Sequence, residues 1–431
     1  MSTKHNANQT ELNRLAKKLV ELVGIFRQGR PASDFHWWNS AAIFDPYHGY
    51  QDGQPLFEEI VQGVIKLNPN MLSEHEVQRR LKFDFLQMQT IKDREAQHAH
   101  GQSLVNEAKQ FLHKLAEFEA WQDVDFLIAN LQQGGEGAKL GRVTFITVAK
   151  EELDLWRKHV KIFWPKEASD VQVIARVRAP GDQHRAISYA RAQVDLVLNI
   201  LRAFCFPFGR YSDTWRVGVI GDLGVAWSYT PMRINNKGFP TRIGASLALI
   251  ELRKDILSKL EKPQWESINK LILKPESSLS SMESKLLDGI HWLAESTKPD
   301  TNNSRFVKIS FALETLIGGE SKDEDLKVRG ITAMLAERAA FIAGRELDDR
   351  LAIDRGIRQY YGMRSNIVHG GEGDASLDDI DEFGQLVRRV SLSLLERLDE
   401  LGNQIGDVEK LEKWVKVQKY TLSEHNSKEV S

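Results

Sequence analysis

Residues 360–371 read Tyr-Tyr-Gly-Met-Arg-Ser-Asn-Ile-Val-His-Gly-Gly, and this stretch decides how the C-terminal part of the chain folds. Its apolar residues recur at spacings of three, four and seven, which predicts one buried stripe along a helix. The stripe comprises Ile357, Tyr360, Tyr361, Ile367 and Val368. Gly370 and Gly371 suit a left-handed cap, so the helix is expected to end with His369 exposed at its mouth.

An arginine occupies the centre of that stripe. Arg364 has an apolar residue four positions before it and another four positions after it. Because a guanidinium that faces a core or an interface is costly when unpaired, Arg364 is expected to have a fixed partner. His369 follows about 140° around an ideal helix, above Ser365 and Asn366. The arginine keeps its charge and can hold a phosphate, while the histidine can transfer a proton near neutral pH.

The spacing of Arg364 and His369 is weak evidence by itself. With 12 histidines in the chain, on the order of one Arg-x4-His match is expected by chance. This pair is the only one in the sequence with four residues between an arginine and a following histidine. The surrounding sequence therefore has to support any interpretation of the motif.

Helical patterns flank the motif over the last third of the chain. Apolar residues at close to 3.6-residue intervals predict helices over residues 282–296, 305–317, 328–343 and 380–401. Gly318 and Gly319 are expected to end the second of them. Helices joined by short polar loops indicate an up-and-down bundle.

The order of the segments in this bundle is more specific than the motif. The chain reads RFVKISFALETLIGG from Arg305, then RGITAMLAERAAFIAG from Arg329, then YYGMRSNIVHGG from Tyr360, and ends in a long helix. This order resembles the Apea-like branch of the HEPN superfamily, with similarity over roughly residues 282–402. The resemblance implies a HEPN-type helical bundle that forms homodimers and brings two Arg/His motifs together across a cleft.

The resemblance also implies an activity. Catalytically active HEPN proteins are metal-independent endoribonucleases without cofactors, and many are toxins or phage-defence effectors that act on tRNA or other RNA. Carried over to this chain, Arg364 and His369 match the two named positions of the motif. Ser365 or Asn366 takes the polar position that follows the arginine in the family. Glu314 matches an acidic position that is frequent in this branch, and it is a candidate partner for Arg364.

These side chains suit cleavage of RNA by its own 2′-hydroxyl. Attack on the neighbouring phosphorus needs a base near the nucleophile and an acid near the leaving 5′-oxygen, and histidine can serve as either. Charge that develops on the non-bridging oxygens can be stabilised by a bidentate arginine. A dimer offers two copies of each group. The expected products carry 2′,3′-cyclic phosphate ends.

A non-catalytic interpretation stays open beside the enzymatic one. In it, Arg364 forms a structural ion pair with Glu314, and His369 only ends a helix. Some HEPN domains serve as scaffolds or ligand-binding modules rather than enzymes. The sequence names neither the RNA target nor a trigger, and it leaves open whether an antitoxin or a phage protein is a partner.

Composition sets the frame for these hypotheses. The chain has 431 residues, enough for two or three domains, and its 42% hydrophobic and 27% charged residues are typical of a globular protein. A formal net charge of −2 gives no global attraction to nucleic acid, so RNA binding would require a local basic cleft. Cys205 is the single cysteine, which excludes an intramolecular disulfide and fits a reducing cytoplasm. It lies in an apolar run and is expected to be buried.

Targeting signals are not evident. Residues 1–13 are polar and lack the apolar core of a signal peptide, and no stretch approaches the ~18 apolar residues of a membrane span. The expected location is the cytoplasm, with no membrane partner.

The predicted fold is mainly α with a smaller α/β portion. It comprises an N-terminal helical region (1–130), a central α/β region with a sensing or regulatory role (131–275), the HEPN-type bundle (282–402), and a C-terminal helix and tail (403–431). Further helices are predicted over residues 11–26, 56–67, 74–92, 102–120, 186–204, 243–260 and 408–420. Strands are predicted over residues 142–148, 171–177, 217–220 and 225–229, and loops over 28–56 and 132–141.

Overall fold

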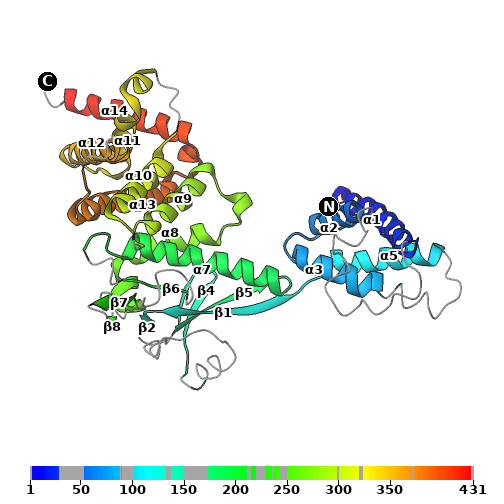
Figure 1. Ribbon diagram of the computed structural model, residues 1–431. Helices are drawn as coiled ribbons and strands as arrows, with labels where there is room; N and C mark the ends of the chain where they lie inside the picture. Colours follow the sequence, from blue (N-terminus) through cyan, green and yellow to red (C-terminus); the bar gives the residue numbers. More distant parts are fainter. Residues whose placement is uncertain are drawn as a thin grey trace. The chain divides into compact units, whose positions relative to one another are not determined.

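The computed structural model describes residues 2–28, 53–87, 89, 101–132, 137–149, 151, 173–210, 215–219, 230–234, 237–241, 250–298, 300–319, 324–369 and 373–428. The chain is mainly α-helical with a smaller α/β portion, as the sequence predicts (Figure 1). It divides into two compact units. The first comprises Met1–Val124 with Arg178–Ala192, and the second comprises Asp125–Val177 with Gln193–Ser431. Within the described ranges, no helix combines the length and the apolar character needed to cross a membrane.

The first unit is built mostly from helices. These are α1 (Ser2–Gln28), α2 (Gln54–Leu67), α3 (Glu74–Arg79) with its π-helical continuation η4 (Arg80–Gln87), and α5 (Gly101–Ala116). Helix α1 packs against α2 and α5. The helix predicted over residues 11–26 is confirmed, and its apolar stripe is buried in one core: Leu12, Leu15, Leu19, Leu22 and Val23. The predicted loop over residues 28–56 and the predicted strand over 225–229 lie almost wholly outside the described residues.

The helix predicted over residues 102–120 is too long. Helix α5 ends at Ala116, and the strand β1 (Trp121–Ala129), which the sequence pattern did not reveal, follows it. Two aspartates interrupt the apolar character of this strand. Each is paired with an arginine of β5 (Val173–Pro180): Asp123 lies 3.3 Å from Arg178, and Asp125 lies 2.8 Å from Arg176. Such cross-strand pairs stabilise a strand but leave no trace in its local hydrophobic pattern.

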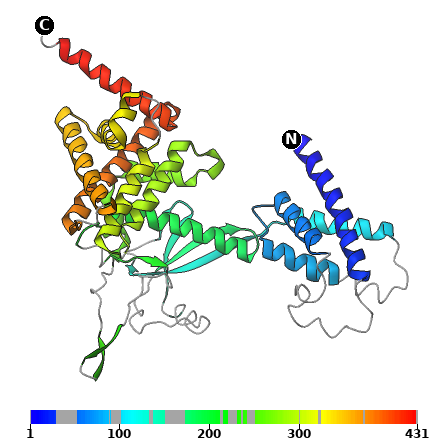
Figure 2. The same cartoon turned by 45° about the horizontal axis from the view of Figure 1, so that its top comes forward.

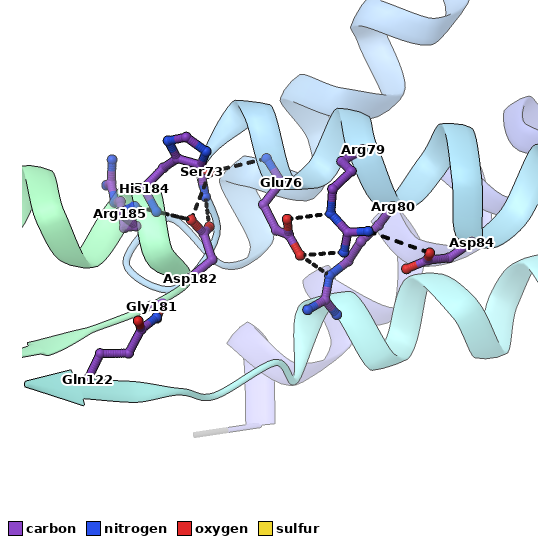
Figure 3. A network of polar contacts seen from close by, with 10 residues as sticks. All are labelled: Ser73, Glu76, Arg79, Arg80, Asp84, Gln122, Gly181, Asp182, His184 and Arg185. Carbon is purple, nitrogen blue, oxygen red and sulfur yellow. Dashed lines mark hydrogen bonds and ion pairs between the residues drawn. The ribbon is translucent and has the colours of Figure 1, made fainter. Parts of the chain in front are cut away.

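A buried aspartate joins two segments of the first unit that are far apart in sequence. Asp182 is 6% exposed and directly precedes α7 (Gln183–Cys205). Its Oδ1 accepts hydrogen bonds from the backbone N–H groups of His184 (2.9 Å) and Arg185 (3.1 Å). Its carboxylate also accepts bonds from the backbone N–H (2.5 Å) and the hydroxyl (3.0 Å) of Ser73, as Figure 3 shows. One carboxylate thus caps α7 and holds the residue that caps α3.

The residue before Asp182 must be a glycine. Gly181 has a φ of +100°, and a Cβ there would lie 2.8 Å from the carbonyl oxygen of Met71. Its backbone N–H donates to Ala120 (2.8 Å), and the backbone N–H of Asp182 donates to Met71 (2.8 Å). A tight turn therefore precedes α7 and fixes it against the segment that precedes α3.

Replacing Asp182 with alanine is expected to lower the free energy of unfolding by about 1–3 kcal/mol, because it removes a helix cap and the two bonds from Ser73. Urea denaturation followed by circular dichroism measures the loss. Asp182→Asn keeps an oxygen acceptor for α7 and should retain part of the stability. Equal stability of the wild type and Asp182→Ala would contradict this role.

The second unit contains the main sheet. Its strands lie in the order β3 (Ala138–Leu140), β4 (Val143–Thr147), β5, β1 and β6 (Gly218–Val219). Strands β4 and β5 pair antiparallel, with Val143 opposite Val177 and Thr147 opposite Val173. The predicted strands over 142–148, 171–177 and 217–220 are confirmed within a few residues. Figures 1 and 2 show the second half of α7 along one face of this sheet.

Two predictions in this region are partly wrong. Strand β3 lies within residues 132–141, which were predicted as a loop, and it pairs with β4 through three residues on each strand. The helix predicted over 243–260 contains the short strand β9 (Ile250–Glu251), which pairs parallel with β2 (Leu131–Gln132). Only the non-α turns η7 (Leu252–Ile256) and η8 (Leu257–Lys259) follow. A second small sheet is the hairpin of β7 (Thr230–Ile234) and β8 (Lys237–Thr241).

The helices predicted over the last third of the chain are confirmed, and α8, which the sequence pattern did not reveal, precedes them. The C-terminal bundle comprises α8 (Lys262–Leu273), α9 (Ser281–Glu295), α10 (Asn302–Ile317), α11 (Glu324–Ala343), α12 (Leu347–His369), α13 (Leu377–Leu401) and α14 (Val408–Lys428). Phe306, Ile309, Leu313 and Leu316 of α10 are all fully buried. Helices α9 and α10 approach closely at Gly289, and this approach requires a glycine because a Cβ there would lie 2.4 Å from Leu316. Gly318 caps α10, and Gly319 has a φ of +135°.

The bundle also holds the end of α7. Arg388 of α13 donates to the carbonyl oxygens of Ala203 (2.7 Å) and Phe206, and its guanidinium lies 4.3 Å from the centre of the Phe208 ring. Arg305 of α10, which is 2% exposed, donates to the carbonyl oxygen of Phe208. Two arginines from different helices therefore fix the segment after α7. This agrees with the division of the chain, in which the end of α7 and the bundle belong to the same unit.

Candidate functional site

Helix α12 changes from buried to exposed along its length. Asp348 and Asp349 lie in its first turn, where negative charge favours a helix. Ile357, Tyr360 and Tyr361 are buried, as predicted. The expected continuation of the apolar stripe is wrong, because Ile367 is only half-buried and Val368 is 48% exposed. The last two turns of α12 thus emerge from the core instead of lying within it.

Two tyrosines fix the helix just before it emerges. Tyr360 stacks on Phe383 with 5.0 Å between ring centres and donates a 2.5 Å hydrogen bond to Glu382. Tyr361 donates to the Oε1 atom of Glu314 at 2.9 Å. Burial, together with this bond, raises the pKa of Tyr361 to about 12, so its hydroxyl keeps its proton and stays a donor at neutral pH.

Arg364 lies one turn beyond Tyr361 and reaches the same carboxylate. Its Nη2 atom is 3.4 Å from Oε1 of Glu314, with 18% and 25% of the two side chains exposed. The guanidinium also lies 5.5 Å from the centre of the Tyr361 ring. The expected fixed partner of Arg364 is therefore present. In the described part of the chain, its Nε atom is buried without a hydrogen-bond partner.

The other predicted site residues lie on the exposed side of α12. Ser365, Asn366 and His369 are all exposed, and His369 is the last residue of the helix. The two polar residues precede His369 by four and three positions, so they lie beneath it on the same side. Among the described residues, no hydrogen bond or ion pair joins His369 to Arg364 within one chain. Gly370 and Gly371, the predicted cap, lie outside the described residues.

An aromatic hollow adjoins the Arg364–Glu314 pair, and the sequence pattern did not reveal it. It has a volume of about 360 Å³ and is lined by Trp292 of α9 and by Phe311, Glu314 and Thr315 of α10. The rings of Trp292 and Phe311 meet edge to face with centres 5.4 Å apart. Both lie outside the apolar stripes that predicted their helices. An aromatic residue off the stripe is the signal that could have revealed the hollow.

A larger hollow opens elsewhere in the same unit and shares no residue with α12. Its volume is about 590 Å³, and its lining contains Arg345, Arg388, Arg389 and Arg397 beside Glu396 and Glu400. Four cations and two carboxylates leave this arginine pocket with two net positive charges. Burial lowers the pKa of Arg388 to about 10. The sequence pattern did not predict this pocket, since its residues come from α8, α11 and α13 and from the loop after α11.

Two other side-chain features bear on chemistry. Cys205 is buried as predicted, and burial raises the pKa of its thiol to about 12, which suits a packing residue better than a nucleophile. A protein metal site commonly needs three or more histidine, cysteine, aspartate or glutamate side chains close together. Within the residues that the structure describes, no such group is present.

Comparisons with models of protein families, with curated proteins and with solved structures find no match for this chain. Its function must therefore be argued from the geometry of α12 and its neighbours.

Proposed function

We propose that this protein is a metal-independent endoribonuclease of the HEPN type, acting in the cytoplasm as a toxin or phage-defence effector. The observation that carries the proposal is the end of α12. There, Arg364 lies against Glu314 while the next two residues, Ser365 and Asn366, and His369 at the end of the helix are exposed. A charged guanidinium and an accessible imidazole are thus held on one rigid element, as phosphate chemistry requires.

The side chains have separate roles in the proposed reaction. Arg364 stabilises the charge that develops on the non-bridging phosphate oxygens. His369 removes the proton from the 2′-hydroxyl, and the second His369 of a homodimer protonates the leaving 5′-oxygen. Ser365 or Asn366 orients the imidazole or a phosphate oxygen. Glu314 and Tyr361 position Arg364 through the contacts described above.

A homodimer is part of this proposal. The exposure of His369 and of the last turns of α12 leaves room for a second copy to bring its own motif to the same phosphodiester. The substrate is RNA, with tRNA as the first candidate. An antitoxin or a phage protein would act through the regions that precede the bundle, as a restraint or a trigger.

The test is incubation of the purified full chain with tRNA and total cellular RNA in buffer containing excess EDTA. RNA cleavage that persists in EDTA is the expected result. Absence of cleavage with and without divalent cations, for protein shown to be folded and dimeric, would overturn the proposal. The dimer is checked by light scattering coupled to gel filtration.

Replacing Tyr361 with phenylalanine should lower the cleavage rate by about tenfold, since Glu314 loses a hydrogen bond and holds Arg364 less firmly. Tyr360→Phe is a matched control, because Tyr360 lies beside Tyr361 and also donates to a glutamate. It should lose comparable stability but keep the wild-type cleavage rate. Equal cleavage rates for the two variants would contradict the positioning role of Tyr361.

The arginine pocket favours a second candidate function, a non-catalytic HEPN scaffold or ligand-binding module. Its two net positive charges and its volume of about 590 Å³ suit a small anionic ligand. In that case Arg364 and Glu314 would be a structural ion pair. An inactive wild type whose melting temperature rises with an added phosphorylated ligand would favour this function.

A further inference from the structure

The aromatic hollow beside Glu314 has the chemistry of a nucleobase site. Trp292 and Phe311 form two walls at an interplanar angle of 68°, and both are half-buried, so part of each ring stays accessible. Aromatic side chains bind unpaired bases by stacking, whatever the identity of the base. At about 360 Å³, the hollow lies at the small end of the range for ligand pockets.

The position of the hollow connects it to the proposed chemistry. Glu314 lines the hollow and also pairs with Arg364 at 3.4 Å. A base in the hollow would therefore place its own backbone next to the guanidinium proposed to hold the phosphate. The ammonium group of Lys285 lies 3.5 Å from the carbonyl oxygen of Thr315, a residue that lines the hollow. This places a positive charge close to a lining residue, and such a charge would attract a neighbouring phosphate.

The carboxylate in the hollow restricts what can bind. Ionised Glu314 only accepts hydrogen bonds, and its Oε1 atom already accepts from Tyr361. The remaining oxygen can accept from an N–H group on the Watson–Crick edge of a base. Such an edge is free only when the base is unpaired, because pairing occupies it. The hollow thus suits single-stranded RNA and excludes a paired base.

We infer that Trp292, Phe311 and Glu314 form a subsite for one unpaired base next to the scissile phosphate. This inference rests on the proposed ribonuclease function, because only a ribonuclease has a scissile phosphate beside the subsite. The base stacks on one of the two rings, meets the other at its edge, and donates to Glu314, which positions its phosphate at Arg364. Trp292 is then a positioning residue for RNA.

The test measures binding and cleavage separately. Fluorescence anisotropy gives the dissociation constant for wild type, Trp292→Ala and Trp121→Ala. The probe is a labelled short single-stranded RNA with 2′-O-methyl groups, which lacks the nucleophile and therefore stays intact during the measurement. Trp121 is 49% exposed on β1 and serves as the matched control. Loss of one stacked base should weaken binding by about tenfold or more in Trp292→Ala, while Trp121→Ala binds like the wild type. The same RNA annealed to its complement should bind more weakly, and Trp292→Ala should not change that binding.

The outcomes separate the subsite from the nuclease. If wild type cleaves RNA and Trp292→Ala binds and cleaves equally well, the subsite is wrong and the proposed function stands. If wild type binds RNA through Trp292 but does not cleave it, the proposed ribonuclease function is wrong and the base-binding role of the hollow is supported. Loss of the dimer in Trp292→Ala, seen by light scattering, would assign the hollow to contact between two copies and overturn the inference. Phe311→Leu, which keeps an apolar wall, repeats the binding test if Trp292→Ala fails to fold.

Discussion

Replacing His369 with alanine is expected to lower the rate of RNA cleavage by about 10²–10⁴-fold, the range for losing a general acid or base. Replacing Arg364 with alanine should lower it by about 10²–10³-fold, because the developing charge on the phosphate loses its cation. Neither change should unfold the protein. His369 is exposed at the end of α12, and Arg364 lies on the half-buried turn just before it.

Each variant has a matched control within the chain. Arg358 lies on α12 and pairs with Asp354 at 2.7 Å, with 48% of its side chain exposed. His113 is an exposed histidine on α5, paired with Glu117. Arg358→Ala and His113→Ala should cleave RNA at the wild-type rate. Full activity of both His369→Ala and Arg364→Ala would end the catalytic interpretation, and the ion pair with Glu314 would then be structural only.

A second large effect is expected on stability. Arg338 of α11 is 1% exposed, and it donates to Glu412 of α14 at 3.0 Å and to the carbonyl oxygen of Ile317 at 2.8 Å. Burial lowers the pKa of Arg338, and the carboxylate of Glu412 partly opposes this. Glu412→Ala leaves the buried guanidinium without its counter-ion. The expected loss of unfolding free energy is about 3–5 kcal/mol.

Urea denaturation measures this loss, with Glu266→Ala as the control. Glu266 forms an exposed pair with Lys262 on α8, with most of both side chains in solvent, and such pairs contribute about 1 kcal/mol or less. Glu412→Gln keeps a hydrogen-bond acceptor and should fall between the two. A Glu412→Ala protein as stable as Glu266→Ala would show that α14 does not depend on this contact.

The sequence predicted the bundle well because its helices carry long periodic stripes. Phe306, Ile309, Leu313 and Leu316 of α10 are buried as their spacing indicates. Strand β1 was not predicted because two aspartates, which pair with arginines of β5, interrupt its apolar pattern, and β3 and β9 are too short to show a period. The strands of the sheet also come from distant parts of the chain, which a local pattern does not record.

The candidate site also contains features that the sequence predicted and features that it did not. The cost of leaving a guanidinium unpaired predicted a fixed partner for Arg364, and the resemblance, not the physical argument, singled out Glu314 as the candidate. The exposure of Val368 was not predicted, because spacing marks an apolar residue as core wherever the helix continues. Trp292 and Phe311 were not singled out, because their meeting depends on how α9 and α10 pack. Residue type thus predicted that Arg364 has a partner, and packing added the hollow beside the pair.

The central claim is that the RNA 2′-hydroxyl attacks its own phosphorus between Arg364 and His369. The most direct test is the chemistry of the product ends, measured by mass spectrometry after cleavage in excess EDTA, beside DNA of the same sequence. The claim predicts 2′,3′-cyclic phosphate and 5′-hydroxyl ends from RNA, and intact DNA, since DNA lacks the nucleophile. Products with 3′-hydroxyl and 5′-phosphate ends, or cleavage of the DNA, would contradict it.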